Sequence, residues 1–104
     1  MIKHIVLLAF SPTVEESKIK KSIEKLGALR NKEVPEILSF SYGKNCSPES
    51  LDQGFNYAFV MEFANEKTRD IYLKSVAHKA IAQNEILPLL VNGIQSAIVL
   101  DYKC

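Results

Sequence analysis

Runs of apolar residues divide the chain into predicted strands. Four stretches are rich in β-branched and aromatic residues and are bounded by turn residues, namely 5–10, 37–42, 57–63 and 94–102. Ser11 and Pro12 close the first run, and Gly43 closes the second. The residues from Gly43 to Gly54 have the composition of a long surface loop. We therefore expect four strands, with this loop between the second and the third.

Helical periodicity occupies the intervals between these strands. In the first interval, apolar residues recur at positions 19, 23, 26 and 29 with lysine and glutamate between them, which predicts an amphipathic helix ending near Arg30. Residues 13–16 have the capping-box pattern that starts such a helix. Asn65 and Ser75 are the predicted N-caps of two further helices, one through position 73 and one from about 76 to 86.

The order of these elements predicts the fold class. Strand, helix, strand, strand, helix and strand form the βαββαβ pattern of a ferredoxin-like α+β protomer, in which helices cover one face of an antiparallel sheet. A chain of 104 residues has the length of one domain, so we expect a single domain over 1–104.

The predicted strands are apolar on both faces, which a half-covered sheet does not require. In the first strand Val6, Leu8 and Phe10 point one way, while Ile5, Leu7 and Ala9 point the other. Helices cover only one of these faces. We therefore expect a homodimer in which a second copy of the chain packs sheet against sheet and pairs the protomers into a dimeric α/β barrel.

Composition and charge narrow the function classes. A formal net charge of +1 provides no basic field for a phosphate backbone, so nucleic acid is not an expected partner. An RNA-recognition domain shares the order of elements, but its aromatic-glycine signature is missing from the third strand. The apolar start of the chain is too short for a membrane span, so no membrane association is expected. The positions of the two cysteines do not indicate a disulfide framework, which favours the reducing environment of the cytoplasm as the location.

Two histidines and a tyrosine are the candidates for chemistry. His4 shares a strand face with Val6 and Leu8, so these three would line a substrate pocket if helices cover that face. His78 falls in the first turn of the third helix, where the helix dipole favours a neutral imidazole that can act as a base. Tyr72 on the second helix would donate a hydrogen bond beside it. Each residue also has an ordinary structural interpretation, as a strand-end histidine, a surface histidine and a core tyrosine.

Asp101, near the end of the last strand, either orients an imidazole or is solvated where the sheet frays. The predicted substrate-binding residues are therefore His4, Val6, Leu8 and Asp101. The loop over 43–54 lacks the spacing of a phosphate-binding loop, and two histidines without other residues at ligand spacing do not indicate zinc. Neither a metal nor another cofactor is expected.

The assembled pattern resembles the stress-responsive dimeric α/β-barrel (Dabb) domain family over essentially the whole chain. The matching positions are Lys3-His4-Ile5-Val6, Val34-Pro35-Glu36-Ile37, residues 43–49 with Gly54-Phe55, Phe63, Tyr72 with His78, and Asp101-Tyr102. The family's usual stretch after the tyrosine is Tyr-x-x-His-Pro-x-His. Here Tyr72 is followed by Leu-Lys-Ser-Val-Ala-His, which keeps the spacing but replaces the first histidine and the proline.

The resemblance implies a homodimer that binds a small apolar or aromatic molecule between sheet and helices. The similar plant polyketide cyclase implies an alternative, in which the positions matching His78 and Tyr72 act as base and oxyanion donor without a cofactor. A small cofactor-independent monooxygenase shares the same fold and is a further alternative. The last interpretation is structural, with the dimer itself as the functional product.

Overall fold

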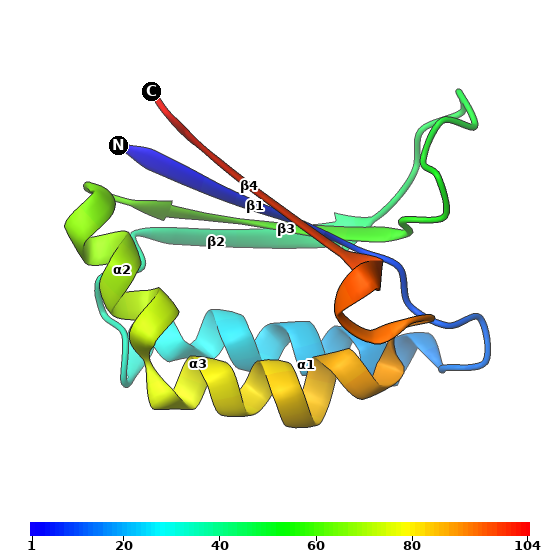
Figure 1. The fold of residues 1–104 in the computed structure, drawn as a ribbon, viewed down its shortest axis with the longest axis horizontal. Coiled ribbons are helices and arrows are strands. Elements are labelled where there is room, and N and C mark those ends of the chain that lie inside the picture. The colour runs from blue at the N-terminus through cyan, green and yellow to red at the C-terminus, as the bar shows by residue number, and fades with distance from the viewer.

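Four antiparallel strands form one sheet in the computed structural model, which describes residues 1–104. The strands are β1 (Ile2–Leu8), β2 (Ser39–Lys44), β3 (Tyr57–Phe63) and β4 (Ala97–Lys103), in the spatial order β2-β3-β1-β4. Figure 1 shows the sheet as one layer with the helices beneath it, and the two chain termini meet at one end. The ferredoxin-like fold is confirmed.

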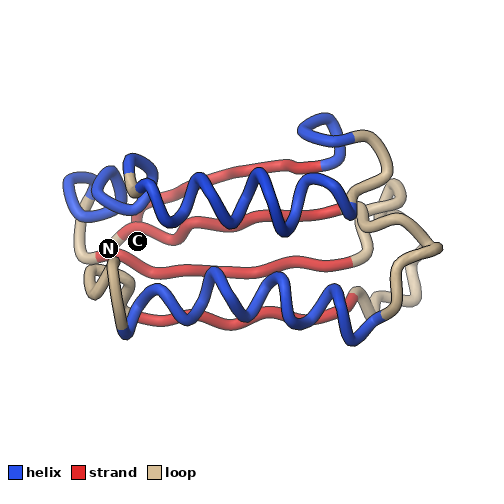
Figure 2. Tube along the Cα trace, turned by 90° about the horizontal axis from the view of Figure 1, so that it is seen from below, coloured by secondary structure: helices blue, strands red, loops and turns tan.

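All the helices cover the same face of the sheet. They are α1 (Glu16–Gly27), α2 (Glu66–Lys74) and α3 (Val76–Ile81). In Figure 2, seen from the helical side, two helical rows run along the sheet. The second row continues beyond α3 as a π-helical turn (Ala82–Ile86) and a 3-10 turn (Leu87–Leu89), so the helical stretch predicted to end near residue 86 is longer and irregular.

The core lies between this face and the helices. Burial alternates strictly along β1 and β3, as expected for strands with one covered face. From β3 the side chains of Tyr57, Phe59, Met61 and Phe63 all point into the core. Gly27 brings the end of α1 close to β2, because a Cβ there would lie 2.3 Å from the Phe40 ring.

The first strand lies earlier than its apolar run predicts. β1 spans Ile2–Leu8 instead of 5–10, and Phe10 forms only an isolated bridge with Leu90. The physical reason is Asn56, whose side chain accepts from the Phe10 amide at 2.9 Å and donates to the Phe10 carbonyl at 3.0 Å. These two bonds take the place of a strand ladder, while Phe10 still packs in the core.

The predicted capping box at residues 13–16 does not form, so that prediction was wrong. α1 begins at Glu16 with Glu15 as its N-cap, and no side chain caps it. The Thr13 hydroxyl instead bonds the Ser11 hydroxyl at 2.9 Å, inside a turn that ends before the helix starts. By contrast, the caps at Asn65 and Ser75 form as predicted, with Thr68 completing a capping box around Asn65.

Two other strand boundaries differ from the prediction for local reasons. The second strand was expected from Ile37, but that residue lies in a turn in which its amide bonds the Val34 carbonyl. The fourth strand was expected from Ile94, but Gly93–Ser96 forms a 3-10 turn that is held by a bond from the Asn92 amide to the Ser96 hydroxyl. The core residue Ile37 is nevertheless buried.

The opposite face of the sheet has no helix over it. It presents Ile5 and Leu7 of β1, Val60 of β3, and Ile98 and Leu100 of β4, which the strand register places side by side. The loop between β2 and β3 rises on this side, away from the helices (Figure 1). None of the helices is long and apolar enough to cross a membrane.

Candidate functional site

His4 is the buried polar residue at the centre of the candidate site. It lies on β1 with its side chain toward the helices and is 3% exposed. Its strand neighbours are Met61 on β3 and Asp101 on β4. The rings of Phe59 and Phe63 each lie 6.3 Å from its ring, measured between centroids. An imidazole in such apolar surroundings needs a polar partner.

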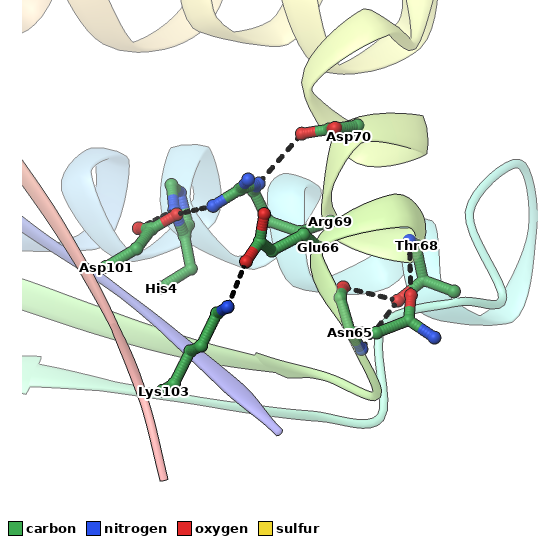
Figure 3. Close-up of polar contacts among 8 residues, drawn as sticks. All are labelled: His4, Asn65, Glu66, Thr68, Arg69, Asp70, Asp101 and Lys103. Atoms are coloured by element: carbon green, nitrogen blue, oxygen red, sulfur yellow. Dashed lines mark hydrogen bonds and ion pairs between the residues drawn. The ribbon is translucent and has the colours of Figure 1, made fainter.

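Asp101 is that partner, so it is not a solvated residue at a frayed strand end. Its Oδ1 lies 2.7 Å from His4 Nδ1, and its Oδ2 accepts from Arg69 Nη1 of α2 at 2.7 Å. Arg69 Nε donates in turn to Asp70 at 2.9 Å. Figure 3 shows this chain of contacts joining β1, β4 and α2.

Tyr72 and His78 stack on each other beside His4. Their ring centroids lie 4.1 Å apart with the planes tilted by 35°. The Tyr72 ring also meets the edge of His4 at 5.6 Å and contacts Phe63 at the same distance. We call His4, Tyr72 and His78 the ring cluster. These three residues come from β1, α2 and α3, so the fold brings together the residues singled out in the sequence.

Two polar atoms of the ring cluster have no hydrogen-bond partner. The Tyr72 hydroxyl and His78 Nδ1 are both buried and unpaired. Burial raises the pKa of the Tyr72 hydroxyl well above its ordinary value, so it stays protonated and can donate. Burial lowers the pKa of His78, so its imidazole is neutral near pH 7 and has one N–H donor and one acceptor nitrogen. The stacked pair of rings thus contains a hydroxyl and a ring nitrogen without partners.

The start of α3 places His78 although the usual histidine and proline before it are replaced. The Ser75 hydroxyl accepts from the His78 amide at 3.3 Å, which caps the helix in place of that sequence. The Ser75 amide bonds the Tyr72 carbonyl, which ends α2. Ser75 therefore joins the two helices at a sharp corner, and this corner stacks His78 on Tyr72.

The predicted pocket between sheet and helices stays a prediction. The candidate lining residues Val6 and Leu8 face the helices but are part of the packed core, 6% and 3% exposed. A cavity of about 780 Å³ lies instead on the uncovered face, between the strands and the β2–β3 loop; Leu7 and Val60 are among its lining residues. No group of three or more His, Cys, Asp or Glu side chains is arranged to hold a metal.

Sequence reasoning missed Arg69. It lies one helical turn before Tyr72, so the spacing alone places both on neighbouring parts of one face of α2. The sequence did contain one signal for Arg69, namely a charged residue one helical turn before the candidate Tyr72. Its partner Asp101 is 32 positions away, which no local pattern shows.

Comparison with known proteins supports the same family as the sequence pattern. The model of the stress responsive A/B barrel domain, Dabb, matches residues 2–104. The stress-response A/B barrel domain-containing protein HS1 of Arabidopsis thaliana is 28% identical over 102 residues, which cover 98% of this chain and 88% of that protein.

Two solved structures have the same fold. A crystal structure of an Arabidopsis thaliana protein superposes with a TM-score of 0.87 and 29% identity, over 100% of this chain and 95% of that one. A dimeric ferredoxin-like protein from Jannaschia sp. CCS1 superposes with a TM-score of 0.86 and 21% identity, over 99% and 98% of the two chains. Because the family model covers nearly every residue, this chain belongs to the stress responsive A/B barrel (Dabb) domain family.

Proposed function

We propose that this protein is a homodimer in which each protomer binds a small apolar or aromatic molecule at the ring cluster. The observation that carries the proposal is the pair of unpartnered atoms, the Tyr72 hydroxyl and His78 Nδ1. Leaving a buried polar group unpaired costs about 1–3 kcal/mol. A ligand that carries one hydroxyl or carbonyl group would pair with them and bury its apolar part against Phe63 and Tyr72.

The helices over the site are lightly packed, which supports entry of a ligand there. In α2 only Tyr72 is buried, and in α3 no residue is fully buried. Segments with few buried apolar contacts open at low free-energy cost. Ligand binding would therefore move α2 and α3 away from the sheet, and the space for the ligand would form as it enters.

The uncovered face of the sheet supports the homodimer. Ile98, Leu100 and Tyr102 are between 42% and 56% exposed on this face, beside Ile5 and Leu7. A contiguous apolar surface of this kind marks an interaction site. The Jannaschia protein of the same fold is a dimer, which favours a second copy of this chain as the occupant.

Binding is tested with two tyrosine-to-phenylalanine variants. Tyr57 also has a buried hydroxyl without a partner, but it packs against Phe10 away from the ring cluster. Small phenols and β-diketones are titrated into the ¹⁵N-labelled protein, and the amide shifts are followed by NMR. We expect shifts around Tyr72 and His78, a loss of affinity of about tenfold in Tyr72→Phe, and unchanged affinity in Tyr57→Phe. Equal loss in both variants, or binding only at the β2–β3 loop, would contradict the proposal.

A second candidate function is cofactor-independent catalysis by the same residues. It is favoured by the protonation states at the site, because burial keeps His78 neutral as a base and the Tyr72 hydroxyl protonated as a donor to a developing oxyanion. Cyclisation of a β-polyketone, as in the polyketide-cyclase type, would use both. A small-monooxygenase reaction would use the base to deprotonate the substrate, with dioxygen as co-reactant; one oxygen atom would enter the substrate and the other would leave as water. Turnover of such substrates that survives His78→Ala would exclude this candidate.

A further inference from the structure

We propose that Arg69 is a positioning residue of the ring cluster: its guanidinium fixes the Asp101 carboxylate, and Asp101 orients His4 with a proton on Nδ1. The inference rests on the proposed function, since it assigns roles within the same site. It adds a residue that does not itself belong to the ring cluster. It also specifies the kind of ligand that the site accepts.

The geometry around Asp101 is the first step. Its two carboxylate oxygens have separate partners, Oδ1 facing His4 Nδ1 and Oδ2 facing Arg69 Nη1, each at 2.7 Å. The Arg69 and Asp101 side chains are only 19% and 20% exposed. A carboxylate held on both oxygens has little freedom to rotate. Its bond to His4 is therefore fixed in direction by Arg69 (Figure 3).

The tautomer of His4 follows from this bond. An ionised carboxylate only accepts hydrogen bonds, so Nδ1 of His4 must carry the proton that Oδ1 receives. The hydrogen bond made by one ring nitrogen sets the state of the other. In the neutral ring Nε2 then keeps its lone pair and is the acceptor.

Arg69 is needed because a carboxylate with His4 as its only partner could turn away from Nδ1. The guanidinium holds the second carboxylate oxygen in place. The polar groups around His4 come from three elements: Asp101 from β4, Arg69 and Tyr72 from α2, and His78 from α3. The neighbours from β3 are all apolar, namely Met61, Phe59 and Phe63. Arg69 is shared between two carboxylates, Asp101 and the half-exposed Asp70, so it fixes the position of Asp101 without cancelling its charge.

The ligand class follows from the same contacts. A neutral His78 has one N–H donor and one acceptor nitrogen, and the Tyr72 hydroxyl is a further donor. The Arg69 guanidinium is held by Asp101 through Nη1 and by Asp70 through Nε. A carboxylate ligand would therefore compete with two carboxylates for this cation. The site therefore favours a neutral molecule with a hydroxyl group, an alcohol or a phenol, over an organic acid.

A second ion pair provides a matched control. Glu66 and Lys103 also join α2 to β4, one helical turn before Arg69 and two residues after Asp101 (Figure 3). Glu66→Gln removes a helix-to-strand ion pair without touching Asp101 or His4. If the ion pairs only attach α2 to the sheet, Arg69→Gln and Glu66→Gln will have the same effect.

The test is ¹⁵N NMR of the histidine rings in the ligand-free protein, with circular dichroism to verify folding. In the parent we expect a proton on His4 Nδ1. In Arg69→Gln, where Asp101 has only one partner, we expect the ¹⁵N shifts of Nδ1 and Nε2 to move toward a mixture of the two tautomers. Arg69→Lys keeps the charge and should remain close to the parent, as should Glu66→Gln. The double variant Arg69→Gln/Asp101→Asn removes the ionised acceptor and should also lose the preference for a proton on Nδ1.

The outcomes separate this inference from the proposed function. A His4 ring protonated only on Nε2 in the parent, or equal changes in Arg69→Gln and Glu66→Gln, would overturn the role of Arg69. Binding is then compared for phenol and benzoate in parent and Arg69→Gln. Tighter binding of phenol by the parent, with the preference reduced in Arg69→Gln, supports the ligand class; tighter binding of benzoate overturns it. The NMR result on Arg69 stands even if neither compound binds, an outcome that counts against the proposed function alone.

Discussion

At the scale of single residues, the site is defined by which polar atoms have partners and which do not. Asp101 and Arg69 satisfy the Nδ1 atom of His4 through a connected set of bonds. The buried Tyr72 and the half-buried His78 lie beside His4 but have unpaired polar atoms. Buried polar groups in native proteins are usually paired, so this contrast separates the structural part of the cluster from the part that awaits a ligand.

His78 should make the stability of the protein depend on pH. Its folded pKa is lowered by burial, whereas in the unfolded chain it takes a proton near its ordinary pKa of 6.5. Between these two values the unfolded state binds more protons, so the free energy of unfolding falls as pH decreases below about 6.5. We expect the difference in stability between pH 7 and pH 5 to be smaller in His78→Gln than in the parent.

Urea unfolding at a series of pH values measures this dependence. Lys67→Gln is the control, because it removes a lysine charge at an exposed position of α2 that does not act on His78. It should keep the dependence of the parent. Identical pH profiles for the parent and His78→Gln would show that His78 protonates equally in both states.

At the scale of elements, the caps determine where the site helices begin. Asn65 starts α2 with a reciprocal bond to Thr68, and Ser75 starts α3 at the corner that stacks His78 on Tyr72. α1 begins without any side-chain cap and is held by the core contacts of Ile19, Ile23 and Leu26. The lightly packed helices of the site thus depend on their caps more than the well-packed helix does.

Asn65→Ala should destabilise the protein more than Thr13→Ala does, because Asn65 belongs to a capping box that forms and Thr13 to a capping-box pattern that does not form. Loss of the Asn65 side chain removes the bond to the Thr68 amide and should cost about 0.5–2 kcal/mol of stability. Thr13→Ala removes only an exposed bond to Ser11 and should change stability by less than about 0.5 kcal/mol. Chemical denaturation measures both. A larger loss in Thr13→Ala than in Asn65→Ala would reverse the assignment.

At the scale of the whole molecule, the sheet separates two apolar environments. The face under the helices forms the core, and the other face is apolar but uncovered in one protomer. Adjacent residues of β1 therefore have different roles. Leu8 is 3% exposed in the core, whereas Leu7 lines the cavity on the uncovered face.

Leu7→Asp and Leu8→Asp should affect assembly and folding respectively. A carboxylate at Leu8 is buried without a partner and should destabilise the fold by several kcal/mol. At Leu7 it would lie in the proposed dimer interface, so the protomer should fold but not associate. Light scattering and thermal unfolding measure the two effects. We expect the parent at twice 11.7 kDa, and Leu7→Asp near 11.7 kDa with its secondary structure retained. A parent mass near 11.7 kDa would contradict the dimer.

Local patterns in the sequence were sufficient for the order of elements and for two of the three helix starts. Strand alternation and N-caps depend on residues within a few positions of each other, so they can be recognised without the fold. The early end of β1 has a non-local cause. Asn56 ends β1 early by bonding Phe10, which lies 46 positions away, and no local pattern contains that bond.

The chemistry of the site depends on contacts between distant parts of the chain. Asp101 meets His4 across 97 positions, and Arg69 joins them from a third element. Sequence alone could nominate His4, Tyr72, His78 and Asp101 because their residue types are suited to proton transfer and hydrogen bonding. It could not show that Asp101 pairs with His4 while Tyr72 and His78 remain unpaired. Only strand pairing and helix packing bring these groups within bonding distance, and partnership at that distance sets their protonation and their freedom to bind.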